Sequence, residues 1–235
     1  MTRSTTRHRL GLATLLLVLA TTGCGDDQAN FFATYPFDTV METPAQAMAR
    51  FEQAYEGQFP PAYAAMLTAD FSYRFSANAD PNLVVQYGTS WGRARDLSST
   101  SHLFDGFYNE YGEYVPSATA ITLSLAGTRY EADPEHADST RHYAVADSAL
   151  VTLAIDLESG LGTYQVASYH SFRLVRGDAA RLGSGQFADS TRWFLRRQDD
   201  LAEPLGLRAP RATDPARTHS ATSTTWGAIK AQYLQ

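Results

Sequence analysis

The sequence predicts an α+β fold in which a curved antiparallel sheet wraps N-terminal helices and forms a cone with a mouth. Helix-type patterns come first, between residues 43 and 104, and strand-type alternation dominates between residues 121 and 197. Hydrophobic residues make up 44% of the 235 residues, which is enough to build a core. The formal net charge of −6 argues against nucleic acid as a partner.

The first 23 residues have the three parts of an export signal: a basic region ending at Arg9, an apolar run over 10–20, and small residues before Cys24. A run of about eleven residues is too short to span a bilayer. Cys24, the single cysteine, directly follows Gly23. This junction resembles the bacterial lipoprotein signal, in which the cysteine is acylated and becomes the mature N-terminus, although Thr21 replaces the usual Leu. The alternative is an ordinary secretory signal with a free thiol.

The composition divides the chain into four parts. The arm at the C-terminus is rich in Ala, Pro, Thr and Arg, but Trp226, Ile229 and Tyr233 follow one another at spacings of three and four. That spacing predicts a short amphipathic helix that docks on the domain. The four predicted parts are a signal peptide over 1–23, a tether over 24–42, an α+β cone domain over 43–202, and a loosely ordered arm with a docking helix over 203–235.

The first helix of the domain has clear start and stop signals. Thr43 is a good N-cap, Pro44 suits the first helical position, and Gly57 is typical of a helix end. Similar signals predict a short helix over 61–67, a loop over 76–90 and a third helix over 91–104.

Apolar and polar residues alternate in later segments, which predicts half-buried strands. In the longest segment, His170 shares the inward face with Tyr164 and Phe172, whereas Tyr169 and Arg173 point outward. The predicted strands cover 70–75, 121–125, 151–157, 164–175 and 191–197.

Four short motifs occur in a recognisable order: residues 48–55 (MARFEQAY), 67–73 (LTADFSY), Trp91-Gly-Arg, and 193–200 (WFLRRQDD). Together they resemble the nuclear transport factor 2-like superfamily, which includes ketosteroid isomerases and polyketide cyclases. Exported members often end their sheet with Trp-x-Ile-x-Arg-Trp-x-Asp, and here Gln198 replaces the second tryptophan. The resemblance covers residues 43–200 and implies the cone-shaped fold.

The resemblance also implies where catalysis would occur. Enzymes of this superfamily use a carboxylate or histidine base and a tyrosine or protonated aspartate donor inside the cone. His170 and Tyr73 are the candidates here, because both are predicted to point inward. The alternative is a core histidine and an ordinary lining tyrosine, and no acidic residue occupies the middle of an inward strand face.

No metal or cofactor motif is present in the sequence. The acidic and histidine-containing segment 133–142 is predicted to be a solvated hairpin loop rather than a cation site. The segment 104–114 (FDGFYNEYGEY) contains five aromatic residues and is predicted either to grip a ligand or partner or to pack under a sheet edge. The residues chosen for a ligand pocket or rim are Trp91, Phe104, Tyr108 and Tyr164.

These observations favour a non-catalytic protein of the bacterial cell envelope, anchored by lipid on Cys24 and facing the periplasm or the exterior. It would bind a small apolar ligand or an envelope protein and would need no cofactor. The alternative is an isomerase- or cyclase-type enzyme that uses His170 and Tyr73. A third hypothesis is a homodimer through the outer sheet face, which would bury Tyr169, Ser171 and Arg173.

Overall fold

The computed structural model describes residues 41–76, 79, 81–139, 142–177, 189–202 and 221–234. The predicted signal peptide, Cys24, residues 25–40 of the tether and residues 203–220 of the arm lie outside the described residues. No described helix is both long and apolar enough to cross a membrane.

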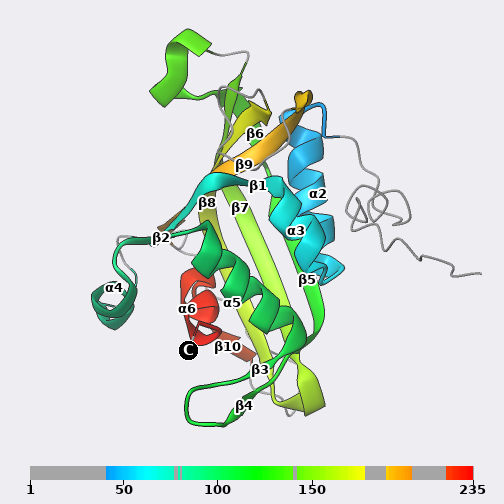
Figure 1. Cartoon of the computed structure of the whole chain (residues 1–235), viewed down its shortest axis with the longest axis vertical. Coiled ribbons are helices and arrows are strands. Elements are labelled where there is room, and N and C mark those ends of the chain that lie inside the picture. The colour runs from blue at the N-terminus through cyan, green and yellow to red at the C-terminus, as the bar shows by residue number, and fades with distance from the viewer. Residues whose placement is uncertain are drawn as a thin grey trace, which may run out of the picture. The chain divides into compact units, whose positions relative to one another are not determined.

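The structure confirms the predicted fold class: a curved, mostly antiparallel sheet is combined with N-terminal helices (Figure 1). The main sheet has the order β2-β1-β9-β8-β7-β5, and β6 and β10 pair with β7 and β8 respectively. Two pairs are parallel, β1 with β9 and β10 with β8. The strands of this sheet are β1 (Leu67–Arg74), β2 (Ser90–Gly92), β5 (Ala118–Ala126), β6 (Arg129–Ala132), β7 (Tyr143–Leu157), β8 (Thr163–Gly177), β9 (Asp189–Ala202) and β10 (Ala221–Ser223).

The long strands bend because their pairing is interrupted. The β7–β8 register shifts between Ala146 and Ala149, where Ser148 has a φ of 52°. The β8–β9 register shifts at three points, one of them next to His170. Such bulges increase twist and let a strand curve around a core. Curvature at these positions directs the middle of β8 toward the helices.

The first helix, α2 (Pro44–Glu56), begins and ends as predicted. The Thr43 hydroxyl accepts a hydrogen bond from the backbone N–H of Gln46, and the Gln46 side-chain oxygen accepts one from the backbone N–H of Thr43, which makes a capping box. The buried face carries Phe51 and Tyr55. The other described helices are α3 (Pro60–Met66), α4 (Pro81–Tyr87), α5 (Arg93–Asp105) and α6 (Trp226–Gln232).

Two sequence predictions were wrong in detail, and one short hairpin was not predicted. The loop expected over 76–90 contains α4, which Pro81 starts. Trp91, expected on the third helix, lies in β2 opposite Tyr73, because strand pairing and ring stacking with Tyr73 fix it there before α5 begins at Arg93. The segment 107–115 contains a short hairpin, β3 (Phe107–Tyr108) and β4 (Tyr114–Val115), which the sequence analysis did not predict.

The core lies between the sheet and helices α2, α3, α5 and α6. Phe51 of α2 contacts Phe172 of β8, with ring centroids 5.6 Å apart. The predicted docking helix, α6, contributes Trp226, Ile229 and Tyr233 to this core, each about 1% exposed. The C-terminal helix is therefore an internal element of the domain.

Candidate functional site

The structure brings His170 and Tyr73 to one buried carboxylate, Asp200. The Tyr73 hydroxyl donates to Oδ2 of Asp200 at 3.3 Å, and Nε2 of His170 lies 3.9 Å from Oδ1. Tyr73 comes from β1, His170 from β8 and Asp200 from β9, three adjacent strands of the sheet. His170 and Tyr73 are fully buried and Asp200 is 5% exposed. We call these three residues the interior cluster.

Both ring nitrogens of His170 have protein partners. The Gln198 side-chain amide lies 3.3 Å from Nδ1, and the Ser168 hydroxyl lies 2.8 Å from Nε2. An amide N–H can only donate, so Nδ1 accepts and Nε2 carries the proton of the neutral ring. Neither nitrogen is left open to a substrate in this arrangement.

The His170 imidazole is held in its neutral form. Burial, and to a lesser extent the charge of the nearby Lys230 ammonium, lower its pKa from 6.5 to about 3. For Tyr73, burial and then the Asp200 charge raise the pKa of the phenol well above its usual value. The interior cluster therefore contains a weak base and a neutral hydrogen-bond donor.

The low pKa of His170 predicts a specific pH dependence of stability. Between pH 6.5 and 3 the unfolded chain binds a proton at His170 that the folded chain does not bind, so stability falls as pH falls, by up to about 1.4 kcal/mol per pH unit. In a His170→Gln variant this contribution is absent, and we expect its free energy of unfolding to change less with pH between pH 6.5 and 5. Urea unfolding of the wild-type protein and the variant across that range measures the difference. Parallel pH curves for the two proteins would contradict the prediction.

A second group of buried polar residues surrounds the ammonium of Lys230 on α6. Its Nζ donates to Oδ1 of Asp96 at 2.5 Å and lies 3.3 Å from the hydroxyl of Tyr63. The Tyr63 hydroxyl also donates to Oδ2 of Asp96, and the indole N–H of Trp91 donates to Oδ1 at 3.2 Å. Lys230 and Asp96 are 1% and 0% exposed. The carboxylate is thus held by three donors, two of which do not belong to α6.

Aromatic rings complete the surroundings of this ammonium. The Nζ of Lys230 lies 5.9 Å from the ring centroid of Tyr55, 5.6 Å from that of Tyr63 and 5.1 Å from that of Tyr73. Burial alone would lower the pKa of Lys230, but the interactions of its ammonium with Asp96 and Tyr55 together outweigh burial and raise the pKa. The lysine is therefore charged in the folded protein. Asp96 and these three tyrosines are called the cation cage below.

α6 packs against both the cation cage and the interior cluster, which share Tyr73. Its Trp226 ring lies 5.4 Å from the His170 ring, centroid to centroid. A Cβ on Gly227 would lie 2.7 Å from the Phe75 ring and 3.1 Å from the Tyr73 hydroxyl, so only glycine fits at this position. A substrate could reach His170 and Tyr73 only after α6 had moved.

The four residues proposed for a ligand pocket or rim lie in different surroundings. Trp91 and Phe104 are buried in the core. Tyr164 is half-buried, and its hydroxyl donates to the side chain of Gln232 at 2.8 Å. Tyr108 lies on the β3–β4 hairpin and is 73% exposed. These four side chains do not form a single rim.

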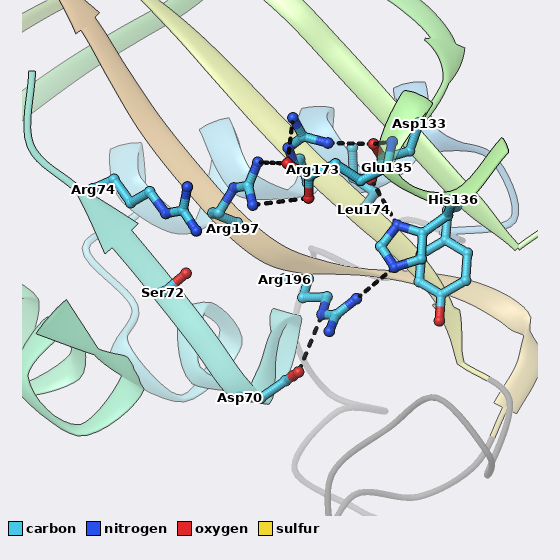
Figure 2. Close-up of a pocket in the computed structure, with 11 residues that line it drawn as sticks. Asp70, Ser72, Arg74, Asp133, Glu135, His136, Arg173, Leu174, Arg196 and Arg197 are labelled. Atoms are coloured by element: carbon cyan, nitrogen blue, oxygen red, sulfur yellow. Dashed lines mark hydrogen bonds and ion pairs between the residues drawn. The ribbon is translucent and has the colours of Figure 1, made fainter. Parts of the chain in front are cut away.

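The outer face of the sheet carries a polar pocket with a volume of about 330 Å³ (Figure 2). Arginines from three neighbouring strands line it. In Figure 2, Arg197 faces Glu135 and Arg196 lies between Asp70 and His136. The full lining is Asp70, Ser72, Arg74, Asp133, Glu135, His136, Tyr143, Arg173, Leu174, Arg196 and Arg197.

The pocket corrects the prediction that residues 133–142 form a solvated hairpin loop. Asp133 is 1% exposed and makes an ion pair with Arg173 of β8. Its neighbour Glu135 makes two hydrogen bonds with Arg197 of β9, at 3.1 and 3.0 Å, and its pKa is lowered chiefly by them. Within the described residues, no group of three or more acidic, histidine or cysteine side chains is arranged to hold a metal ion. The acidic residues instead fix this segment to the sheet.

No protein-family model matches the chain, and no curated protein matches it. Several solved structures do match the chain. A conserved protein from Planctomyces limnophilus is 11% identical, with a TM-score of 0.44, over 67% of this chain and 91% of that chain. A nuclear transport factor 2-like superfamily protein from Salmonella enterica is 10% identical, with a TM-score of 0.41, over 69% of this chain and 92% of that chain. The second of these descriptions names the superfamily that the sequence motifs resemble.

Some similar structures are enzymes. A hexachlorocyclohexane dehydrochlorinase, LinA-type3, from Novosphingobium barchaimii is 7% identical, with a TM-score of 0.39, over 65% of this chain and 79% of that chain. Others have no known function, including a cystatin-like fold protein from Nostoc punctiforme. A fold does not by itself specify a function, so the side chains must carry any functional argument.

Sequence reasoning missed three buried charged residues: Asp96, Asp200 and Lys230. Two of them had a signal. Asp200 ends the closing motif at 193–200, and Lys230 stands four residues after Trp226, on the apolar face of the predicted docking helix. No local pattern in the sequence pointed to Asp96, because its partners Tyr63 and Lys230 lie 33 positions before it and 134 positions after it.

Proposed function

We propose that this protein is a non-catalytic, lipid-anchored protein of the cell envelope that binds a protein partner through its β3–β4 hairpin. The observation that carries the proposal is the exposure of tyrosine on that hairpin: Tyr108, Tyr111 and Tyr114 are 73%, 76% and 47% exposed. Tyrosine supplies a large contact area at low entropic cost and is enriched in protein interfaces. Leu161, 66% exposed, follows the neighbouring turn.

The hairpin is a fixed platform. The side-chain oxygen of Asn109 accepts backbone N–H bonds from Tyr111 and Glu113, at 3.0 and 2.9 Å. The Tyr114 hydroxyl donates to Glu158 at 2.8 Å and so joins the hairpin to the β7–β8 turn (Figure 1). A pre-organised surface loses little conformational entropy on binding.

The interior supports a binding role over a catalytic one. Both nitrogens of His170 are engaged, its pKa is about 3, and α6 occupies the space beside it. A general base works best with a pKa near the operating pH. A small apolar ligand is also disfavoured there, because Trp226 and Ile229 already fill the apolar volume.

Site-specific photocrosslinking in cells tests the proposal. A photoreactive residue at Tyr111 is expected to give one discrete adduct with an envelope protein, whereas the same residue at Val85 of α4, 87% exposed, gives none. In a Cys24→Ser background the protein is expected to leave the membrane fraction and the adduct to be lost. Equal labelling from both positions would overturn the binding surface, and an unchanged membrane fraction would overturn the anchor.

One observation favours an isomerase- or cyclase-type enzyme as the second candidate: His170 and Tyr73 converge on Asp200. A base, a donor and a carboxylate in an apolar interior are the parts that proton transfer next to a carbonyl needs. This candidate requires α6 to leave and the pKa of His170 to rise toward neutrality. A flat pH dependence of stability, contrary to the prediction above, would show that the pKa of His170 is near its ordinary value and would favour the enzyme.

A further inference from the structure

We infer that the domain contains a binding site for an alkylammonium group, formed by the cation cage and occupied in this fold by the chain's own Lys230. The site goes beyond the proposed partner surface, since it lies in the core rather than on the hairpin. Its chemistry is that of an amine receptor: one carboxylate for the ammonium hydrogens and tyrosine rings around the charge.

The cage is built without α6. Asp96 comes from α5, Tyr55 from α2, Tyr63 from α3 and Tyr73 from β1. The Asp96 carboxylate is oriented by the Tyr63 hydroxyl and the Trp91 indole, so its position does not depend on the lysine. Rings also hold one another: the Tyr55 and Tyr63 rings meet edge to face with centroids 5.1 Å apart. The carboxylate therefore remains aimed at the same point when the ammonium is absent.

The ligand class follows from the occupant. Nζ makes one short charged hydrogen bond to Asp96, a bond that a primary ammonium can make and a quaternary one cannot. The aliphatic stem of Lys230 runs through the core, where it is 1% exposed. The site thus fits a primary amine on a short alkyl chain, and it should reject the corresponding alcohol, which has no charge to balance the buried carboxylate.

Lys230 is the single lysine in the chain, so the occupant can be observed by itself. In the full chain labelled with ¹³Cε-lysine, one signal is expected. Ring currents from the surrounding tyrosines should displace it from the position of a solvent-exposed lysine. A signal at the exposed position would show that the ammonium is not in the cage, and it would overturn the inference.

Removing the occupant tests the site itself. Lys230→Ala deletes the equivalent of a propylammonium group. n-Propylammonium should therefore raise the melting temperature of this variant saturably, by about 5–10 °C at a hundred-fold excess over its Kd. The wild-type protein is the matched control: it should not respond, because its tethered lysine has a high effective concentration. 1-Propanol at equal concentration, with matched salt, controls for solvent effects.

A second variant excludes nonspecific stabilisation. In Asp96→Asn/Lys230→Ala the cage has lost its charge, and we expect no response to the amine. An equal response in this double variant, or an equal effect of 1-propanol, would overturn the inference, as would no response in Lys230→Ala. Should Lys230→Ala not fold unaided, folding must be recovered by n-propylammonium and not by 1-propanol; failure with both also overturns the site.

Discussion

Replacing Asp96 with asparagine is expected to lower the free energy of unfolding by about 3–5 kcal/mol, because it removes one partner of a buried ion pair and leaves the other charge uncompensated. The ammonium of Lys230 is 1% exposed, and Asp96 at 2.5 Å is its carboxylate partner. The amide oxygen of asparagine can still accept from Tyr63 or Trp91, so the change isolates the charge. Urea unfolding at pH 7 measures the loss.

Asp105→Asn, at the exposed C-terminal end of the same helix, is the matched control and should change stability by less than about 0.5 kcal/mol. Replacing both partners by apolar residues, Asp96→Leu with Lys230→Met, should recover most of the loss, since a packed apolar pair can be as stable as a buried ion pair. A loss below about 1 kcal/mol in Asp96→Asn would show that Lys230 has another counter-charge or reaches water.

Trp226→Ala is expected to destabilise the domain by about 3–5 kcal/mol, the range for deleting a large buried side chain. Its ring packs against Phe51, Tyr55 and His170, at centroid distances of 6.0, 5.2 and 5.4 Å. The rest of the core can survive if α6 detaches, so the loss cannot exceed the free energy with which α6 docks. Denaturant unfolding gives the magnitude, and hydrogen exchange over residues 226–232 shows whether α6 has opened.

Tyr111→Ala is the control for this variant, because Tyr111 is a large aromatic residue that is 76% exposed. It should leave both stability and α6 protection unchanged within about 0.5 kcal/mol. If Trp226→Ala lost stability while the α6 amides stayed protected, the helix would be held by its other contacts, which include the buried Ile229 and the polar contacts of Lys230. The Ser99 hydroxyl, which donates to the Lys230 carbonyl at 2.6 Å, would then be the next residue to substitute.

Local signals in the sequence were enough to predict the first helix and the faces of the long strands. Thr43, Pro44 and Gly57 act within one turn of the backbone, and the capping box forms as that rule requires. Likewise, the alternation along 164–175 placed His170 and Phe172 inward, and both are fully buried. Period-two patterns succeed here because the helices cover the face that His170 and Phe172 share.

The parts that could not be predicted depend on contacts between distant residues. Trp91 was assigned to a helix because its neighbours favour one, but pairing with Tyr73 draws it into β2. Asp96 looks like a surface residue of an amphipathic helix until Lys230, 134 positions later, is placed beside it. No window of local sequence contains both residues, so local patterns give no sign of the pairing.

The role of α6 in the core has a consequence for the order of folding. The counter-charge of Asp96 stands 134 positions later in the sequence, at Lys230. Contacts between residues so far apart close long loops, and proteins that are rich in such contacts fold slowly. Docking of α6 is therefore expected to be a late step, which follows assembly of the helices and strands that form the cation cage.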